Sequence, residues 1–138
     1  DSGADRLAGF RDAMGAMLDE SLIEPVPLYS YRAGMAGMEA LLERAPDIDG
    51  VFAASDAVAA GAMRALELAG RRVPEDVGVV GFDDSSWARR TEPQLSTVHQ
   101  PAEGLGTAAA RSVLAQVAGS DEATATLLET PIVWRTSA

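Results

Sequence analysis

The stretch Val73-Pro74-Glu75-Asp76-Val77-Gly78-Val79-Val80-Gly81-Phe82-Asp83-Asp84 combines a helix exit, a short apolar run and two carboxylates. Its β-branched valines are typical of a strand that is covered on both faces. In an open parallel α/β sheet, ligands bind in the crevice outside the carboxyl ends of the strands. The sequence therefore predicts that Asp83 and Asp84 lie at the mouth of a binding crevice.

The composition is that of a globular domain with a strong acidic bias. The 138 residues are 47% hydrophobic and 23% charged, and 21 acidic against 11 basic residues give a net charge of −10. This charge repels a phosphate backbone, so nucleic-acid contact is expected only through some other segment of the protein. The absence of cysteine excludes disulfides and thiolate chemistry, and the single His99 leaves few ligands for zinc. No apolar run is long enough to predict a membrane span.

Helical and extended patterns alternate along the chain. Apolar periodicity predicts helices around residues 7–18, 35–45, 56–69 and 102–117, and strands over 26–29, 50–54, 77–81, 97–98 and 132–134. Two prolines weaken the first of these strands, and residues 83–96 are expected to form a loop. Ser55 or Asp56 is placed to cap the third helix, and Gly70 to end it. This alternation predicts an α/β fold with a doubly wound parallel sheet. Because such a unit normally begins with a strand, part of the domain is expected upstream.

Residues that suit a hydroxyl-rich ligand are expected at the edge formed by the carboxyl ends of the strands, which we call the rim. Carboxylates accept hydrogen bonds from hydroxyls, an arginine donates in a fork, and an aromatic ring covers an apolar face. Each residue alone also has a simpler role, such as a helix cap, a turn, a packing ring or a surface charge. Their shared location favours a ligand site. The residues concerned are Arg6, Tyr29, Ser55, Asp56, Asp83 and Asp84.

Several motifs occur in the order of a known family. They are Asp5-Arg6-Leu7-Ala8-Gly9-Phe10, Val51-Phe52-Ala53-Ala54-Ser55-Asp56, Gly61-Ala62-Met63-Arg64-Ala65-Leu66, the stretch 72–84, Leu95-Ser96-Thr97-Val98-His99-Gln100-Pro101 and Gly104-Leu105-Gly106. Together they cover essentially the whole chain, and the stretch 74–84 is the most specific. The chain resembles the effector-binding domain of bacterial transcriptional regulators of the LacI/GalR family, which is itself similar to periplasmic sugar-binding proteins.

The resemblance implies a type I periplasmic-binding-protein-like fold, in which two Rossmann-like lobes close on a ligand and are joined by three crossovers. This chain is expected to be an incomplete two-lobe domain. Residues 1–96 would form mainly the C-terminal lobe, residues 97–118 a crossover and a helix that returns toward the N-terminal lobe, and residues 119–138 a final extended segment. The DNA-binding head and the N-terminal lobe are expected upstream.

By the same resemblance, Arg6 and Asp83 match the paired contacts to effector hydroxyls or heteroatoms, and Tyr29 matches an aromatic that covers a sugar or purine ring. Ser55-Asp56 stands where the family more usually has Asn-Asp, which changes the hydrogen-bonding specificity expected there. Asp84 is expected to be structural.

The resemblance also implies a homodimer formed through this lobe. The candidates for that interface are Met35, Ala59, Met63 and Trp87, with ordinary packing as the alternative for each.

The leading interpretation is effector sensing by a cytoplasmic one-component transcriptional regulator, expected to be a repressor, without catalysis, cofactor or metal. Its partners would be a small effector (a sugar rather than a nucleobase), a second copy, and operator DNA through an upstream domain, with no membrane. The alternative is a periplasmic solute-binding protein of a sugar transporter. A metal-dependent phosphotransfer domain using Asp83 and Asp84 is a third reading, but every basic residue is arginine, so a lysine partner is missing.

Overall fold

A four-stranded sheet organises the protein, whose computed structural model describes residues 2–119 and 127–138. The strands lie side by side in the order β1 (Gly50–Phe52), β2 (Gly78–Asp83), β3 (Ser96–His99) and β4 (Ile132–Val133). The first three are parallel, and β4 runs antiparallel to β3. The parallel α/β sheet predicted from the sequence is confirmed.

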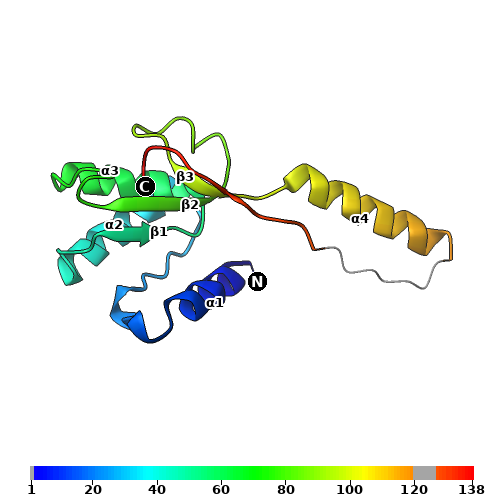
Figure 1. The fold of residues 1–138 in the computed structure, drawn as a ribbon, viewed down its shortest axis with the longest axis horizontal. Helices are drawn as coiled ribbons and strands as arrows, with labels where there is room; N and C mark the ends of the chain where they lie inside the picture. Colours follow the sequence, from blue (N-terminus) through cyan, green and yellow to red (C-terminus); the bar gives the residue numbers. More distant parts are fainter. Residues whose placement is uncertain (1, 120–126) are drawn as a thin grey trace.

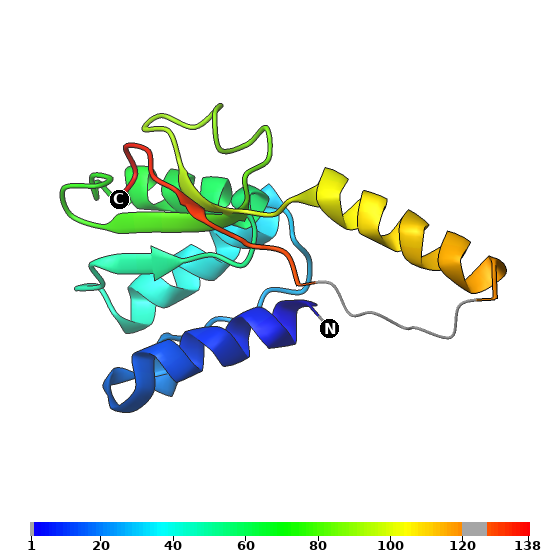
Figure 2. The same ribbon diagram turned by 45° about the vertical axis from the view of Figure 1, so that its right-hand side comes forward.

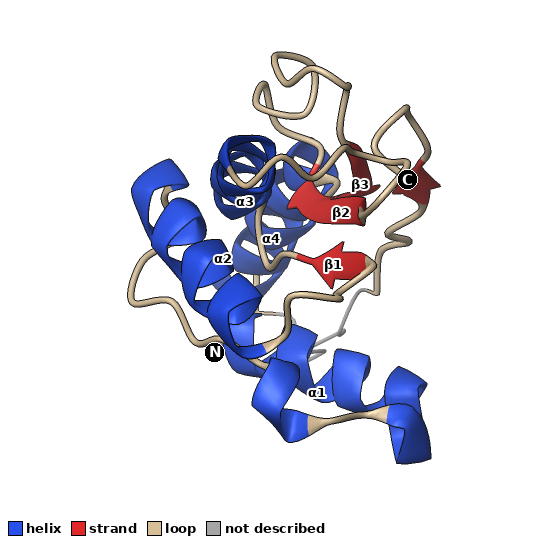
Figure 3. Ribbon diagram, turned by 90° about the vertical axis from the view of Figure 1, so that its left-hand side faces the viewer, coloured by secondary structure: helices blue, strands red, loops and turns tan. Residues whose placement is uncertain are grey.

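Two helices pack against one face of this sheet (Figure 3). They are α2 (Tyr31–Arg44) and α3 (Asp56–Leu68), which lie along each other. The first helix, α1 (Ser2–Met14), lies beside β1 and is followed by two short 3₁₀ helices, η1 (Gly15–Met17) and η2 (Glu20–Leu22). Successive side chains of a strand point to opposite faces. Val51 accordingly packs against the core, while Phe52 stacks on Phe10 of α1 with 5.9 Å between ring centroids.

Glycines let α2 and α3 approach to backbone contact. A Cβ atom on Gly34 would collide with the carbonyl group of Val58, and one on Gly61 would collide with the carbonyl group of Tyr31. Small residues therefore dominate the buried face of α3, and the core forms between this helix pair and the sheet. Its buried members are Met38, Leu41, Ala53, Val58, Ala59, Ala62, Met63, Ala65, Leu66, Val77, Val79, Ala88 and Leu95.

Both ends of α3 follow the sequence prediction. The Ser55 hydroxyl accepts a hydrogen bond from the Val58 N–H at 3.3 Å, which is the expected N-cap. Gly70 has a φ of +74°, a value that costs glycine little. The N–H of Arg71 donates back to the Leu66 carbonyl at 2.9 Å, closing the helix as a Schellman motif.

The strand predicted over residues 26–29 is wrong. Residues 23–30 are irregular, because Pro25 and Pro27 lack the N–H groups that a ladder needs. Val26 instead lies near Gly37 of α2, and the Ser30 hydroxyl caps that helix.

Helix α4 (Ala102–Val117) has the bounds that the sequence predicts, but it extends away from the sheet as an arm (Figure 1). None of its residues is buried, and its exposed large apolar residues are Leu105, Val113, Leu114 and Val117. Of the final segment expected over residues 119–138, residues 120–126 lie outside the described residues. Among the helices described, none has both the length and the hydropathy to cross a bilayer.

Candidate functional site

One guanidinium group joins the carboxyl ends of all three parallel strands. Arg6 Nη1 donates to the carbonyl oxygen of Ala54, which follows β1, at 2.5 Å. Arg6 Nη2 lies 3.5 Å from Asp83 Oδ1 at the end of β2 and donates to Gln100 Oε1, just after β3, at 3.0 Å. Only 14% of the Arg6 side chain is exposed. Of the residues predicted at the rim, Asp83 therefore lies in direct contact with Arg6.

Aromatic rings flank this guanidinium group. Arg6 Cζ lies 3.8 Å from the centroid of the Phe82 ring and 5.8 Å from that of Tyr29. A cation stacked on a ring in this way gains about 1 kcal/mol, and the contact also holds the plane of the guanidinium. Tyr29 is 45% exposed, so much of its surface remains open to another molecule.

Asp83 combines a strained backbone with a partly exposed carboxylate. Its φ is +117°, which a residue with a Cβ rarely adopts, and such strain is typical of functional positions. Burial raises the pKa of its carboxyl above the usual range, opposing the effect of Arg6, and the charge of Asp56 adds to the increase. The side chain is 35% exposed, so it can accept hydrogen bonds from a ligand.

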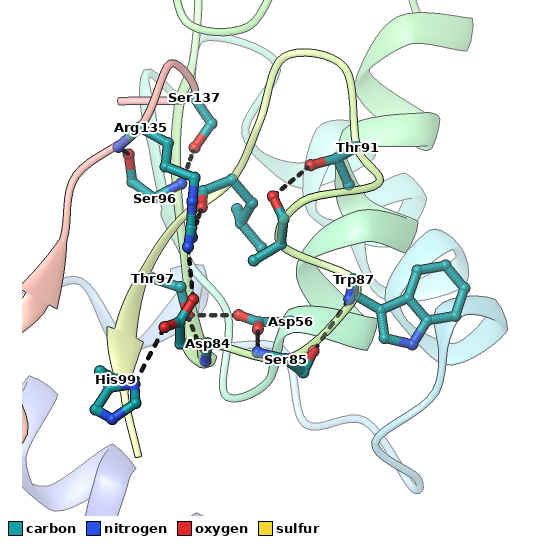
Figure 4. A network of polar contacts seen from close by, with 12 residues as sticks. Asp56, Asp84, Ser85, Trp87, Thr91, Ser96, Thr97, His99, Arg135 and Ser137 are labelled. Atoms are coloured by element: carbon teal, nitrogen blue, oxygen red, sulfur yellow. Dashed lines mark hydrogen bonds and ion pairs between the residues drawn. The ribbon is translucent and has the colours of Figure 1, made fainter. Parts of the chain in front are cut away.

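Ser55 and Asp56 do not present polar atoms at the rim, in contrast to the expectation from the sequence. Ser55 is 3% exposed and caps α3, and Asp56 is fully buried. Asp56 accepts from the Thr97 hydroxyl at 2.5 Å and from the Ser85 N–H at 2.6 Å (Figure 4). The absence of a side chain at Gly81 leaves room for the Asp56 carboxylate. Asp56 therefore ties α3 to β3 and to the loop after β2.

Asp84 links the end of β3 to the segment that follows β4. Its carboxylate accepts from Arg135 Nη2 at 2.6 Å and lies 3.1 Å from His99 Nδ1 (Figure 4). Burial acts to raise the pKa of Asp84, but hydrogen bonds from Arg135 and His99 outweigh it, so the pKa lies below its usual range. The structural role expected for Asp84 agrees with these contacts.

Residues near the end of the sequence are bonded into the sheet, which sequence reasoning missed. The buried Ser137 hydroxyl donates to the Val79 carbonyl at 2.6 Å and accepts from the Ser96 N–H at 2.8 Å. Figure 2 shows this segment running along β3 toward the body of the sheet. No local sequence pattern predicts that Ser137 pairs with residues as distant in sequence as Val79 and Ser96. Phe82 and Gln100 were also missed as members of the rim, although both lie inside recognisable motifs.

The four residues predicted at a dimer interface fall into two groups. Ala59 and Met63 are core residues, with 0% and 6% exposure, so the prediction that they meet a partner is corrected. They face inward because α2 and the sheet enclose α3 on two sides. Met35 is half-buried, and Trp87 is 40% exposed and stacks on Tyr31 with 5.6 Å between centroids.

A groove of about 1140 Å³ begins beside the rim and runs under α1. Its lining is mainly apolar and includes Arg6, Tyr29 and Ala54, whereas Asp83 and Gln100 do not line it. Within the described residues, no group of three or more aspartate, glutamate or histidine side chains is arranged to hold a metal ion.

The chain matches known proteins along its whole length. Residues 1–138 match a family described as a periplasmic binding protein-like domain. The HTH-type transcriptional regulator CelR of Thermobifida fusca is 44% identical over 140 residues, which are 99% of this chain and 41% of that protein. The ribose operon repressor of Halalkalibacterium halodurans is 37% identical over 113 residues, covering 82% of this chain and 34% of that protein.

Solved structures give the same result. A complex of the transcriptional regulator CelR with cellobiose superimposes with a TM-score of 0.91 at 44% identity, covering 99% of this chain and 42% of that one. A sugar-binding transcriptional regulator of the LacI family from Escherichia coli has a TM-score of 0.87 at 33% identity, covering 98% of this chain and 49% of that one. The chain thus spans less than half the length of each of these four relatives.

Proposed function

This chain belongs to the LacI family of transcriptional regulators, as a periplasmic binding protein-like domain, and on that premise we propose that it senses a sugar-like effector. The observation that carries the proposal is the set of contacts around Arg6, which gathers a carboxylate, an amide and two aromatic rings at one rim. Arg6, Tyr29 and Asp83 form the proposed ligand-binding set, with Gln100 added and Ser55 and Asp56 removed.

A small carbohydrate suits these groups better than an apolar ligand does. The Asp83 carboxylate accepts from hydroxyls, Arg6 retains N–H groups that can donate, and the exposed Tyr29 ring can cover the face of a pyranose. A relative 44% identical to this chain has been solved with cellobiose, which supports a sugar over a nucleobase.

Membership of this family also leads us to propose the partners of this domain. The α4 arm would pack against a second lobe, since its apolar residues are uncovered within the described part of the chain. Operator DNA would be bound by a segment outside this acidic domain, in the cytoplasm, with the protein acting as a repressor.

A homodimer would use the surface around Met35, Tyr31 and Trp87, whose aromatic pair is partly exposed. We propose no catalytic step for this domain, and the regulators that it resembles favour this function over solute transport.

The proposal is tested in the full-length regulator by measuring operator release against cellobiose, glucose and ribose. Arg6→Ala and Asp83→Ala should each weaken the response by about 10- to 100-fold, the usual range for losing a hydrogen bond to a charged group. Arg11→Ala is the matched control, because Arg11 is an exposed arginine whose described hydrogen bonds go to Glu20, away from the rim and from the proposed dimer surface. A normal response in both rim variants would contradict the assignment.

A further inference from the structure

We propose that Asp84 and His99 are positioning residues that transmit the effect of a bound ligand from the rim to the α4 arm. This inference rests on the proposed function and deepens it, because it names the contacts through which an effector at the rim would act on the rest of the regulator. It follows from two strand ends that are shared between the rim and a second set of contacts. We call that set, Asp84, His99 and Arg135, the clamp (Figure 4).

Two pairs of adjacent residues are divided between the rim and the clamp. At the end of β2, the Asp83 side chain contacts Arg6, whereas that of the next residue, Asp84, belongs to the clamp. At the end of β3 the order is reversed, since His99 belongs to the clamp and Gln100 accepts from Arg6. The Gln100 N–H also donates to the Asp83 carbonyl at 3.4 Å. Each residue that contacts Arg6 is therefore one peptide bond away from a residue of the clamp.

The backbone at the end of β2 makes this division tight. Asp83 has a φ of +117° and Asp84 a φ of +54°, so two successive residues with side chains lie in the left-handed region. Such conformations persist only where the surrounding contacts hold them. Because the two residues share a peptide unit, a ligand that turns the backbone of Asp83 also changes the direction of the Asp84 carboxylate.

The clamp fixes the point at which the chain leaves the sheet for the arm. His99 is the last residue of β3, and α4 begins three residues later. Its N–H donates to the Pro131 carbonyl at 2.8 Å, and its Nδ1 lies 3.1 Å from Asp84 Oδ2. An ionised carboxylate can only accept, so Nδ1 is the donor. Arg135 donates to the other Asp84 oxygen at 2.6 Å, and only 13% and 11% of these two side chains are exposed.

This arrangement gives the rim a physical route to the arm. In the proposed regulator, the α4 arm would set the position of a second lobe. An effector can shift that position only through contacts that differ between two arrangements of the protein. The hydrogen bond between His99 and Asp84 is such a contact, because it joins the base of the arm to the residue that follows Asp83.

The test measures coupling in the full-length regulator as the ratio of operator Kd values with and without saturating cellobiose, glucose or ribose. Fluorescence anisotropy of labelled operator DNA gives both values. His99→Ala should bring this ratio about 3- to 10-fold closer to 1, as expected for losing one partly exposed hydrogen bond that contributes to coupling. His99→Asn should retain the ratio, because its amide can donate from about the position of Nδ1. A change in the fraction of folded protein does not alter this ratio.

Two further variants separate the clamp from a general loss of stability. Asp84→Asn should lower the coupling ratio as His99→Ala does, and the two losses should not add in the double variant, because each removes the same contact. Asp76→Asn is the matched control. Asp76 is also a carboxylate paired with an arginine, Arg72 at 2.7 Å, but it precedes β2 at the opposite end of the strand from Asp84. Its coupling ratio should equal that of the unsubstituted protein.

The outcomes distinguish this inference from the proposed function. An unchanged ratio in His99→Ala would overturn the inference and leave effector sensing intact, and this holds even if Asp84→Asn fails to fold. If none of the three sugars changes operator binding by the unsubstituted protein, the proposed function fails, and hydrogen exchange decides on the clamp separately. The backbone amides of residues 100–105 should exchange faster in His99→Ala than in His99→Asn, and equal rates would overturn the clamp.

Discussion

Replacing Gly61 by alanine should destabilise the protein, although alanine is the better helix former. Alanine in a helix interior is favoured over glycine by about 1 kcal/mol. At this position, however, the new Cβ would collide with the Tyr31 carbonyl and stand 2.8 Å from the Met35 nitrogen. Both obstacles are backbone atoms of α2, so that helix must move as a unit. Overpacking that forces a backbone shift costs about 3 kcal/mol, which leaves a net loss of about 2 kcal/mol.

The size of the effect on the melting temperature follows from the chain length. At about 2.1 cal/mol/K of unfolding entropy per residue, a loss of about 2 kcal/mol lowers the Tm of a domain of this size by about 7 °C. Urea unfolding followed by far-ultraviolet circular dichroism measures the free energy directly, provided that the slope m is unchanged.

Gly9→Ala is the matched control, since nothing lies within 4 Å of a Cβ at that position in α1. It should stabilise the protein by about 0.5–1 kcal/mol through helix propensity alone. A shift of the two variants in the same direction would refute the argument that the contact between α2 and α3 depends on glycine.

Three further predictions concern polar residues. Ser55→Ala should cost about 1 kcal/mol in urea unfolding because α3 loses its N-cap, and Ser55→Thr should retain most of that stability. Asp84 has a lowered pKa, so its stabilisation of the folded state is present at neutral pH and is lost as the pH falls through the pKa of the folded protein. The Tm of Asp84→Asn should therefore lie below that of the unsubstituted protein at pH 7, and this difference in Tm should disappear in acid. Asp83 has a raised pKa in the folded protein, so folding is less favourable once the pH is high enough to ionise its carboxyl. Asp83→Asn should therefore have the higher Tm at pH 7, with the difference vanishing below about pH 4, in calorimetric scans across pH.

Local patterns carried much of the fold. The strand formed by the valines of β2, and the N-cap and closing glycine of α3, depend on residues only a few positions away. Each of these predictions matched the structure. Topology then placed the rim, since parallel strands that end at one edge bring Ala54, Asp83 and Gln100 together, and α1 adds Arg6 to them. The strand expected over residues 26–29 did not form, because Pro25 and Pro27 cannot donate to a ladder.

The remaining differences depend on long-range packing. Whether Asp56 faces a ligand or the interior is decided by the space over Gly81 and by the Thr97 hydroxyl, neither of which a cap motif reveals. Ala59 and Met63 fit an interface as well as a core by residue type, and only the positions of α2 and the sheet bury them. Gln100 lies at the rim because it follows β3, which pairs with β2, and its side chain accepts a hydrogen bond from Arg6 there.

The buried hydrogen bond between Ser137 and Val79 sets a constraint on the order in which the protein assembles. It joins residues 58 positions apart, and the Val79 N–H also donates to the Ser137 carbonyl. Forming such a pair requires closure of a long loop that contains α4, and non-local pairing of this kind slows folding. Helices α2 and α3 can meet early through neighbouring sequence, whereas this flank of β2 must wait until the arm has been made and the chain has returned. During that interval the nascent sheet exposes an open edge, the period in which the chain is most vulnerable to pairing with another copy of itself.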